Sequence, residues 1–334
     1  MKINNQTHFI LFSNCILVKG YSKSIIMDLQ RNGYLPIPNL LFDVLSLDLK
    51  KNSVGDIKQY FNDMYNNGIN SYFKYLIDEE FGFLTDEPRN FPSLTTKFLS
   101  PFSILSSVIN INEESKFELG AVLQQLVNQG CQLIQIRITK KMTLSYLNEE
   151  LRCIIGSRVK LVEIFIKDRG IALDDIITLF GQNLRVKFII YSSNNYLLEH
   201  QYNNIYYIKE NLNLHQKEVI DPRLFISNIP FYVESKNFNI GLNRKVSIDY
   251  DGSIKNFVNH SEIFGNISNI RLKDIIVDED FQTKWKITND IIEKCKDCEF
   301  RYMCLSNSDI LAKDSKYYKV EQCKYDPYIG KWLN

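Results

Sequence analysis

The chain has 334 residues, of which 45% are hydrophobic and 24% are charged. At roughly 150 residues per domain this length predicts two or three domains, and the composition excludes wholesale disorder, a fibrous repeat and a disulfide-stapled miniprotein. The 40 basic and 39 acidic residues leave a formal charge of +1, so no overall field attracts nucleic acid or an anionic membrane.

The amino-terminal 90 residues predict a small module of strands followed by helices. Two β-prone runs, 8–19 and 24–29, are separated by a turn at Gly20 and form a hairpin. Apolar residues then recur with helical spacing over 37–45. A second helix is expected to begin at the N-cap Ser53 and to end at Gly68, and a third follows over 70–81. A hairpin with three helices is typical of a winged-helix-like module.

The middle of the chain alternates helices with β-branched strands. The proline-rich stretch 86–101 has no period and is expected to be a linker. Beyond it, an alternation of this kind predicts right-handed βαβ units and a parallel sheet, either open or a partial (β/α) barrel. The expected helices cover 117–129, 144–155 and 173–180, and the expected strands cover 131–139, 160–167, 186–193 and 204–208.

The carboxy-terminal part has a different sequence pattern. It opens with a hairpin around the turn pair Asp251-Gly252 and continues as an irregular, cysteine-rich segment. The predicted domains are therefore a winged-helix-like module over 1–90, an α/β body over 91–238 and a cysteine-rich domain over 239–334.

Cysteine usage divides the chain. Three cysteines stand alone, at 15, 131 and 153, and the other four crowd 295–323. An odd total of this kind favours a reducing compartment with one metal site over a disulfide framework. The amino terminus lacks a cleavable signal pattern, and no stretch approaches the roughly 20 apolar residues of a membrane span. The sequence therefore predicts a cytoplasmic protein that does not enter the membrane.

The strongest chemical signal is a Cys-x2-Cys turn made by Cys295 and Cys298, with Cys304 and Cys323 following. Two thiolates on one turn meet one centre while turn N–H groups point at the sulfur atoms. Four thiolates suit tetrahedral zinc and a 4Fe–4S cluster equally well, and the alternative is a pair of buried free thiols with two bystanders. With no open position, such a centre would hold structure or carry electrons.

The cysteine-rich segment resembles a known family. The residues DYDGSIKNFVNHSEIFGNI and IIEKCKDCEFRYMC, followed by Cys323, are similar to the SPASM domain, the iron–sulfur module of radical S-adenosylmethionine peptide maturases. The opening run FILFSNCILVKGYSKSIIMDLQRNGYLPIP is similar to maturases of the grasp-with-spasm type, which are encoded with an ATP-grasp ligase and a small precursor peptide. The resemblance implies one 4Fe–4S cluster on the four cysteines.

The chain departs from that family in two ways. It has no CxxxCxxC triplet, so it is not expected to cleave S-adenosylmethionine. The ligands of a second SPASM cluster are also replaced, because Phe257 and Ser308 stand where the pattern has cysteines. His260 is a possible substitute ligand, although a histidine near such a loop is more often a surface residue.

The same resemblance makes the amino-terminal module a leader-peptide recognition element. Its mechanism would be the addition of the leader as a strand to a sheet edge, with Ser24 to Leu29 and the helix containing Tyr72 and Tyr75 as the candidate positions. The alternatives are a module that merely packs on the body and a winged-helix DNA reader. Nucleic acid is not the expected partner, because the net charge is near zero.

These observations predict a maturation factor for a ribosomally made peptide that binds the precursor, works beside an ATP-grasp ligase and has no catalytic residue of its own. The alternative is an iron–sulfur redox enzyme that modifies the peptide itself. Weaker candidates are the charged loop 167–170, which follows a strand, and the strand residues Arg137 and Glu163, which point into a barrel interior or outward. The chain lacks a Gly-rich phosphate loop, HExxH and GxSxG.

Overall fold

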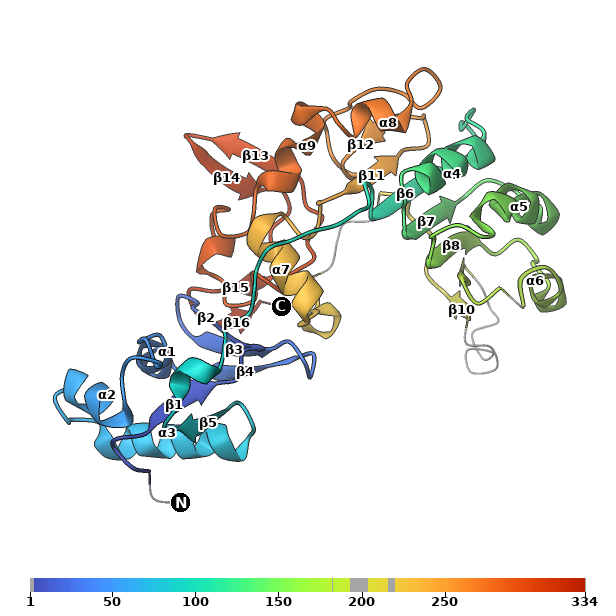
Figure 1. The fold of residues 1–334 in the computed structure, drawn as a ribbon. Coiled ribbons are helices and arrows are strands. Elements are labelled where there is room, and N and C mark those ends of the chain that lie inside the picture. Colours follow the sequence, from blue (N-terminus) through green and yellow to red (C-terminus); the bar gives the residue numbers. More distant parts are fainter. Residues whose placement is uncertain (1–2, 182, 193–203, 216–219, 334) are drawn as a thin grey trace.

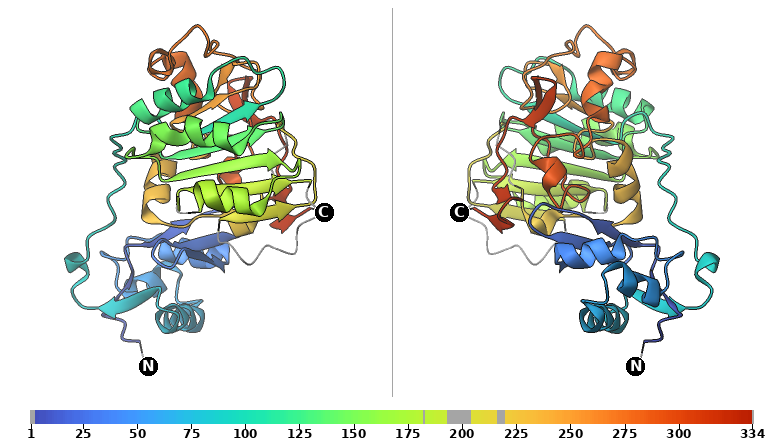
Figure 2. Two further views of the ribbon diagram at one scale, coloured as in Figure 1. Left: turned by 90° about the vertical axis from the view of Figure 1, so that its right-hand side faces the viewer. Right: turned by 90° about the vertical axis from the view of Figure 1, so that its left-hand side faces the viewer.

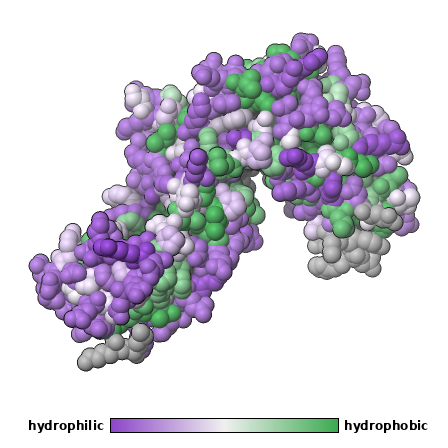
Figure 3. Space-filling model, viewed as in Figure 1, coloured by the Kyte–Doolittle hydropathy of each residue, from purple (hydrophilic) through white to green (hydrophobic). Residues whose placement is uncertain are grey.

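The computed structural model describes residues 3–181, 183–192, 204–215 and 220–333. The chain forms a mixed α/β structure with three parts, and Figure 1 shows the amino-terminal module at one end of an arch and a parallel sheet at the other. Figure 3 shows that the surface is hollowed between these two parts. Within the described ranges, no helix is long and apolar enough to cross a membrane.

The amino-terminal module contains a three-stranded antiparallel sheet, a two-stranded ribbon and three helices. The sheet has the order β2-β3-β4, with β2 at Cys15–Val18, β3 at Ser24–Asp28 and β4 at Gly33–Ile37. The ribbon pairs β1 (His8–Leu11) with β5 (Gly82–Thr85). The helices are α1 (Asn39–Leu45), α2 (Val54–Tyr60) and α3 (Asn66–Asp78). The expected hairpin and three helices are present.

Three details of this module differ from the sequence prediction. The run 8–19 is divided between two sheets, because residues 12–14 turn the chain between β1 and β2. Gly68 lies inside α3 instead of ending α2, while the capping box of Ser53 and Asp56 forms as expected. β3 is the central strand and pairs with both neighbours, so residues 24–28 have no edge to offer a leader peptide. The outer strands of this sheet are β2 and β4.

The body is an open seven-stranded sheet of order β10-β9-β8-β7-β6-β11-β12, in which every pair is parallel except β11 with β12. The sheet does not close into a barrel. Its strands are β6 (Ser106–Ile111), β7 (Leu133–Ile138), β8 (Leu161–Lys167), β9 (Val186–Tyr191), β10 (Ile205–Ile208), β11 (Lys245–Ile248) and β12 (Ile254–Lys255). β6 lies outside the strands predicted from the sequence. β11 and β12, which lie in the predicted carboxy-terminal domain, extend the same sheet.

Three helices cover one face of this sheet, as the left view of Figure 2 shows. They are α4 (Leu119–Asn128), α5 (Leu144–Glu150) and α6 (Leu173–Phe180), with a 3-10 turn η2 (Leu151–Ile154) after α5. Alternate strand residues such as Ile134, Ile136 and Ile138 are buried beneath them. The residues between these, including Gln135 and Arg137, belong to the opposite face, because side chains alternate across a strand. The helix-covered face is the main core.

The remaining elements lie in the linker, before β11 and after β12. The linker holds one 3-10 turn, η1 (Pro88–Asn90), and η4 (Pro222–Leu224) precedes α7 (Ile229–Asn237). After β12 come α8 (Leu272–Ile275), α9 (Glu279–Lys286) and the turn η5 (Cys295–Asp297). Two small antiparallel ribbons end the chain, formed by β13 (Ile310–Lys313) with β14 (Lys316–Lys319) and β15 (Tyr325–Asp326) with β16 (Lys331–Trp332).

Candidate metal centre

The Cys-x2-Cys segment folds as a tight turn. Lys294 has a positive φ of 67°, which reverses the chain before η5, and the N–H of Cys298 donates to the carbonyl oxygen of Cys295 at 3.0 Å. The N–H of Phe300 points back at sulfur and lies 3.4 Å from Cys298 Sγ. The spacing of the two cysteines therefore produces the turn geometry that thiolate centres use.

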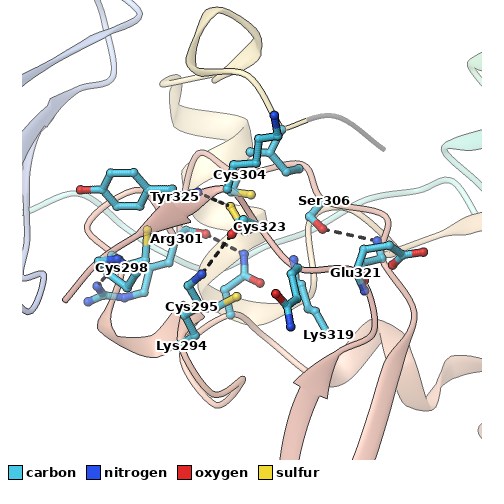
Figure 4. A pocket seen from close by; sticks show the side chains of 16 residues that line it. Lys294, Cys295, Cys298, Arg301, Cys304, Ser306, Lys319, Glu321, Cys323 and Tyr325 are labelled. Atoms are coloured by element: carbon cyan, nitrogen blue, oxygen red, sulfur yellow. Dashed lines mark hydrogen bonds between the residues drawn. The ribbon is translucent and has the colours of Figure 1, made fainter. Parts of the chain in front are cut away.

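All four clustered cysteines line one cavity of about 160 Å³, which we call the cysteine cavity (Figure 4). Cys295, Cys298 and Cys304 come from the turn and the segment after it, and Cys323 comes from the loop that follows β14. Each side chain is half-buried, with its exposed area facing the cavity. Among the described residues, no three histidine, cysteine or acidic side chains form a group that could hold a metal ion. The thiols surround a shared space.

Burial favours the neutral form of three of these thiols. It raises the pKa of Cys295 and Cys298, and it raises the pKa of Cys304 to about 11, although the nearby Lys319 ammonium lowers the pKa of Cys295 and Cys304. Since metals bind thiolates, loading the site must release protons. The four thiols would leave no coordination position open once bound to a shared centre.

Neighbouring donors support the cysteine positions. Lys294 Nζ donates to the carbonyl oxygen of Cys323 at 3.0 Å, and the N–H of Tyr325 lies 3.4 Å from Cys323 Sγ. Arg301 Nε is paired with Asp290 Oδ1 at 2.8 Å. Lys319 and Tyr325 are residues of the cavity that sequence analysis missed, because nothing local in the sequence marks a lysine or tyrosine as facing a thiol.

The amino-terminal sheet packs directly on this turn. Tyr21 N donates to the carbonyl oxygen of Asp297 at 2.8 Å, and Arg301 Nη1 donates to the carbonyl oxygen of Lys19 at 2.6 Å. Beneath these bonds lies a buried apolar group, which we call the junction cluster. It combines side chains of β2 and β3, of α7 and of the cysteine segment: Val18, Ile25, Met27, Leu29, Tyr232, Val233, Phe300, Tyr302, Met303 and Tyr325, with Cys298 and Cys323 against it.

Glu299, next to Cys298, is fully buried at this junction. It accepts a hydrogen bond from the Tyr325 hydroxyl and lies 3.9 Å from Lys23 Nζ of the amino-terminal sheet. Burial, followed by the Glu299 carboxylate, raises the pKa of Tyr325 and keeps its phenol protonated as the donor. The close approach depends on Gly20, because a Cβ there would lie 2.9 Å from Glu299 Oε2 and 2.3 Å from the Lys23 carbonyl oxygen.

The positions at which the SPASM pattern has cysteine ligands for a second cluster do not form a ligand set. Phe257 and Ser308 are both buried, and only Ser308 lines the cysteine cavity. The expectation of an exposed His260 is wrong, since its side chain is 1% exposed. Its Nε2 donates to the carbonyl oxygen of Asn307 at 2.9 Å and its Nδ1 lies 3.5 Å from Asp309, so it serves in a structural network.

The three solitary cysteines lie apart from the cavity. Cys131 belongs to the core of the body, and Cys15 belongs to the core of the amino-terminal module. Burial raises the pKa of each thiol to about 12. Cys153 packs against the body core with its Sγ 3.5 Å from the Glu150 carbonyl oxygen. The charged loop after β8 is an exposed turn whose Arg169 pairs with Glu113 at 3.4 Å.

No family model and no curated protein matches the chain. Among solved structures, it is similar to the crystal structure of Streptococcus suis SuiB bound to precursor peptide SuiA. The match has 11% sequence identity and a TM-score of 0.27, and it covers 91% of this chain and 94% of that one. The likeness is therefore loose, although it extends over nearly all of both chains.

Proposed function

We propose that this chain is a maturation factor for a ribosomally made peptide, which it binds through its amino-terminal module and presents to an ATP-grasp ligase. In this proposal the four cysteines at 295, 298, 304 and 323 hold one 4Fe–4S cluster. The observation that carries it is the cysteine cavity with the amino-terminal sheet packed on its turn. The peptide and the ligase as partners are inferred from the resemblance of both segments to grasp-with-spasm maturases.

The size of the cysteine cavity supports a cluster over a single ion. Zinc holds each sulfur at about 2.3 Å, which draws four thiolates together and leaves no space between them. The space of about 160 Å³ that these side chains surround suits a larger group. When bound, a cluster with four thiolate ligands stabilises the fold or transfers an electron. The chain contributes the N–H groups of Phe300 and Tyr325, which donate to sulfur and offset its charge.

The peptide would dock on an outer strand of the amino-terminal sheet. β3 is paired on both sides, whereas β4 pairs only with β3 among the described strands. Pro36 is typical of an edge strand, because it lacks the N–H that a central strand needs. Tyr34 on β4 and Tyr75 on α3 are both exposed, so they are available to side chains of an added strand.

The ligase activity is assigned to a partner. An ATP-grasp enzyme binds nucleotide, and this chain carries no Gly-rich phosphate loop. Its proposed contribution is to hold the precursor while the partner forms the bond.

Fluorescence anisotropy with the labelled precursor encoded beside this gene tests the proposal. The full chain should bind that peptide and not a scrambled version. N-methylation of alternate residues in the docked segment should weaken binding about tenfold, because strand addition uses every second N–H group. Methylation of the intervening residues is the matched control and should have little effect. Absence of binding, or a neighbourhood without an ATP-grasp gene and a short precursor gene, would contradict the proposal.

A further inference from the structure

A second cavity lies on the face of the sheet that the helices leave open. It measures about 340 Å³, within the range of ligand pockets, and we call it the sheet cavity. Its floor comes from β6, β7, β8 and β11, and Phe257 and Asn307 of the carboxy-terminal part complete the lining. The right view of Figure 2 shows the carboxy-terminal segment in front of this face of the sheet. The residues that line it include Val108, Leu133, Leu161, Phe257, Arg137 and Glu163.

The charged side chain of Arg137 lines this cavity and has no carboxylate partner among the described residues. Its Nε donates to Gln135 Oε1 at 2.8 Å and its Nη1 donates to the Leu214 carbonyl oxygen at 3.0 Å, and both acceptors are neutral. In the part of the chain that the structure describes, no acidic side chain forms an ion pair with it. A guanidinium has five N–H donors, so these two bonds leave donors for a ligand.

Two acidic side chains on this side of the sheet, Glu163 and Asp249, form their ion pairs with lysines. Glu163 lies 3.4 Å from Lys187 Nζ and accepts from Gln135 Nε2 at 3.3 Å. Asp249 lies 3.0 Å from Lys255 Nζ. Burial lowers the pKa of Arg137, and the nearby Tyr191 and Asp249 act in the opposite direction. A partly buried guanidinium that has no ion pair among the described residues is a suitable binding group for an anion from outside.

The lining defines which anion fits. Arg137 lies 5.9 Å from the centroid of the Phe257 ring, and Lys245 lies 5.3 Å from the same centroid. Phe257 and the apolar residues Val108, Leu133 and Leu161 offer contacts to hydrocarbon, which an inorganic phosphate could not use. A planar carboxylate matches the guanidinium fork, and its carbon chain matches the apolar wall.

We propose that the sheet cavity binds the side-chain carboxylate of an acidic peptide residue, with Arg137 as its counter-ion. The inference that a peptide supplies this carboxylate rests on the proposed function, whereas the inference of a carboxylate site does not. The core of a precursor held on the amino-terminal module would then reach the open face across the hollow seen in Figure 3.

Ligand-observed NMR on the full chain tests this with N-acetyl-glutamate methylamide, its neutral glutamine analogue and butyrate. The glutamate probe should bind about tenfold or more tightly than the glutamine probe, because a charged hydrogen bond is lost with the carboxylate. Arg137→Gln should abolish that preference and Arg137→Lys should reduce it, while the exposed control Arg89→Gln should retain it. Equal binding of the glutamate and glutamine probes would overturn the proposal. Equal binding of butyrate and the glutamate probe would overturn the peptide source.

Thermal unfolding separates a binding role from a structural one. Without ligand, Arg137→Gln should unfold at the same temperature as the wild type or higher, since the variant removes a partly buried charge that has no ion pair among the described residues. The glutamate probe should raise the unfolding temperature of the wild type only. Failure of both Arg137 variants to fold would assign Arg137 a structural role and overturn the proposal. This experiment does not use the precursor, so its failure and that of the proposed function are distinguishable.

Discussion

At the scale of single residues, the local sequence predicts the cysteine turn and long-range packing decides the rest. The two-residue gap between Cys295 and Cys298 is sufficient to place both thiols on one turn, and this was predicted. That Lys319 and Lys23 approach the same turn was not predicted, because their approach depends on chain segments brought together by the fold. Sequence spacing contains no information about such distances.

His260 shows how burial overrides a local expectation and leads to a test. Burial lowers the pKa of His260, and this outweighs the attraction of Asp309, which is itself bound by Lys284 at 2.8 Å. The unfolded chain therefore binds this proton at a higher pH than the folded chain does. The stability associated with neutral His260 is fully present above the unfolded pKa near 6.5 and is lost as the pH falls below it.

We therefore expect the free energy of unfolding to decrease as the pH falls from about 6.5 towards 5, and His260→Asn to remove part of that decrease. Urea denaturation at a series of pH values measures it. The half-buried His8→Asn variant changes the same residue type in the amino-terminal module and is the control. An unchanged pH profile in His260→Asn would show that other groups cause the acid sensitivity.

At the scale of elements, strong hydrophobic periodicity was sufficient to predict a helix or a strand, whereas mixed signals were not. The helix over 173–180 and the strands β7 to β9 were predicted close to their observed bounds, because each has an unbroken apolar alternation or stripe. β4 was missed because Pro36 is rare in strands, and β6 was missed because its two serines interrupt the apolar run. Both strands form because a neighbour supplies their hydrogen bonds.

The contact between the amino-terminal sheet and the cysteine turn gives a prediction at this scale. Gly20→Ala would place a methyl group against Lys23 and Glu299, so it should reduce the free energy of unfolding by about 1–3 kcal/mol. It should also speed hydrogen exchange of the β2 and β3 amides. Gly33→Ala is the matched control, because a Cβ there meets nothing within 4 Å and its effect should stay within about 0.5 kcal/mol. Equal effects of the two substitutions would contradict this account of the junction.

At the scale of the whole molecule, the fold joins the beginning of the chain to its end. The junction cluster unites β2 and β3 with residues beyond 297, a contact that composition and periodicity could not predict. The α/β class and an open or partly closed sheet were predicted, and the sheet is open. The division at 90 and 238 stays a prediction, since β11 and β12 extend the sheet of the body. The winged-helix and SPASM assignments stay proposals.

The central claim is that the four thiols of the cysteine cavity hold an iron–sulfur cluster. Iron, zinc and acid-labile sulfide analysis of the full chain, purified without oxygen, tests it most directly. The account predicts about four iron and four sulfide per chain, loss of most of both in Cys298→Ser and no loss in Cys153→Ser, whose thiol lies outside the cavity. One zinc per chain without sulfide, or equal iron in the two variants, would contradict it.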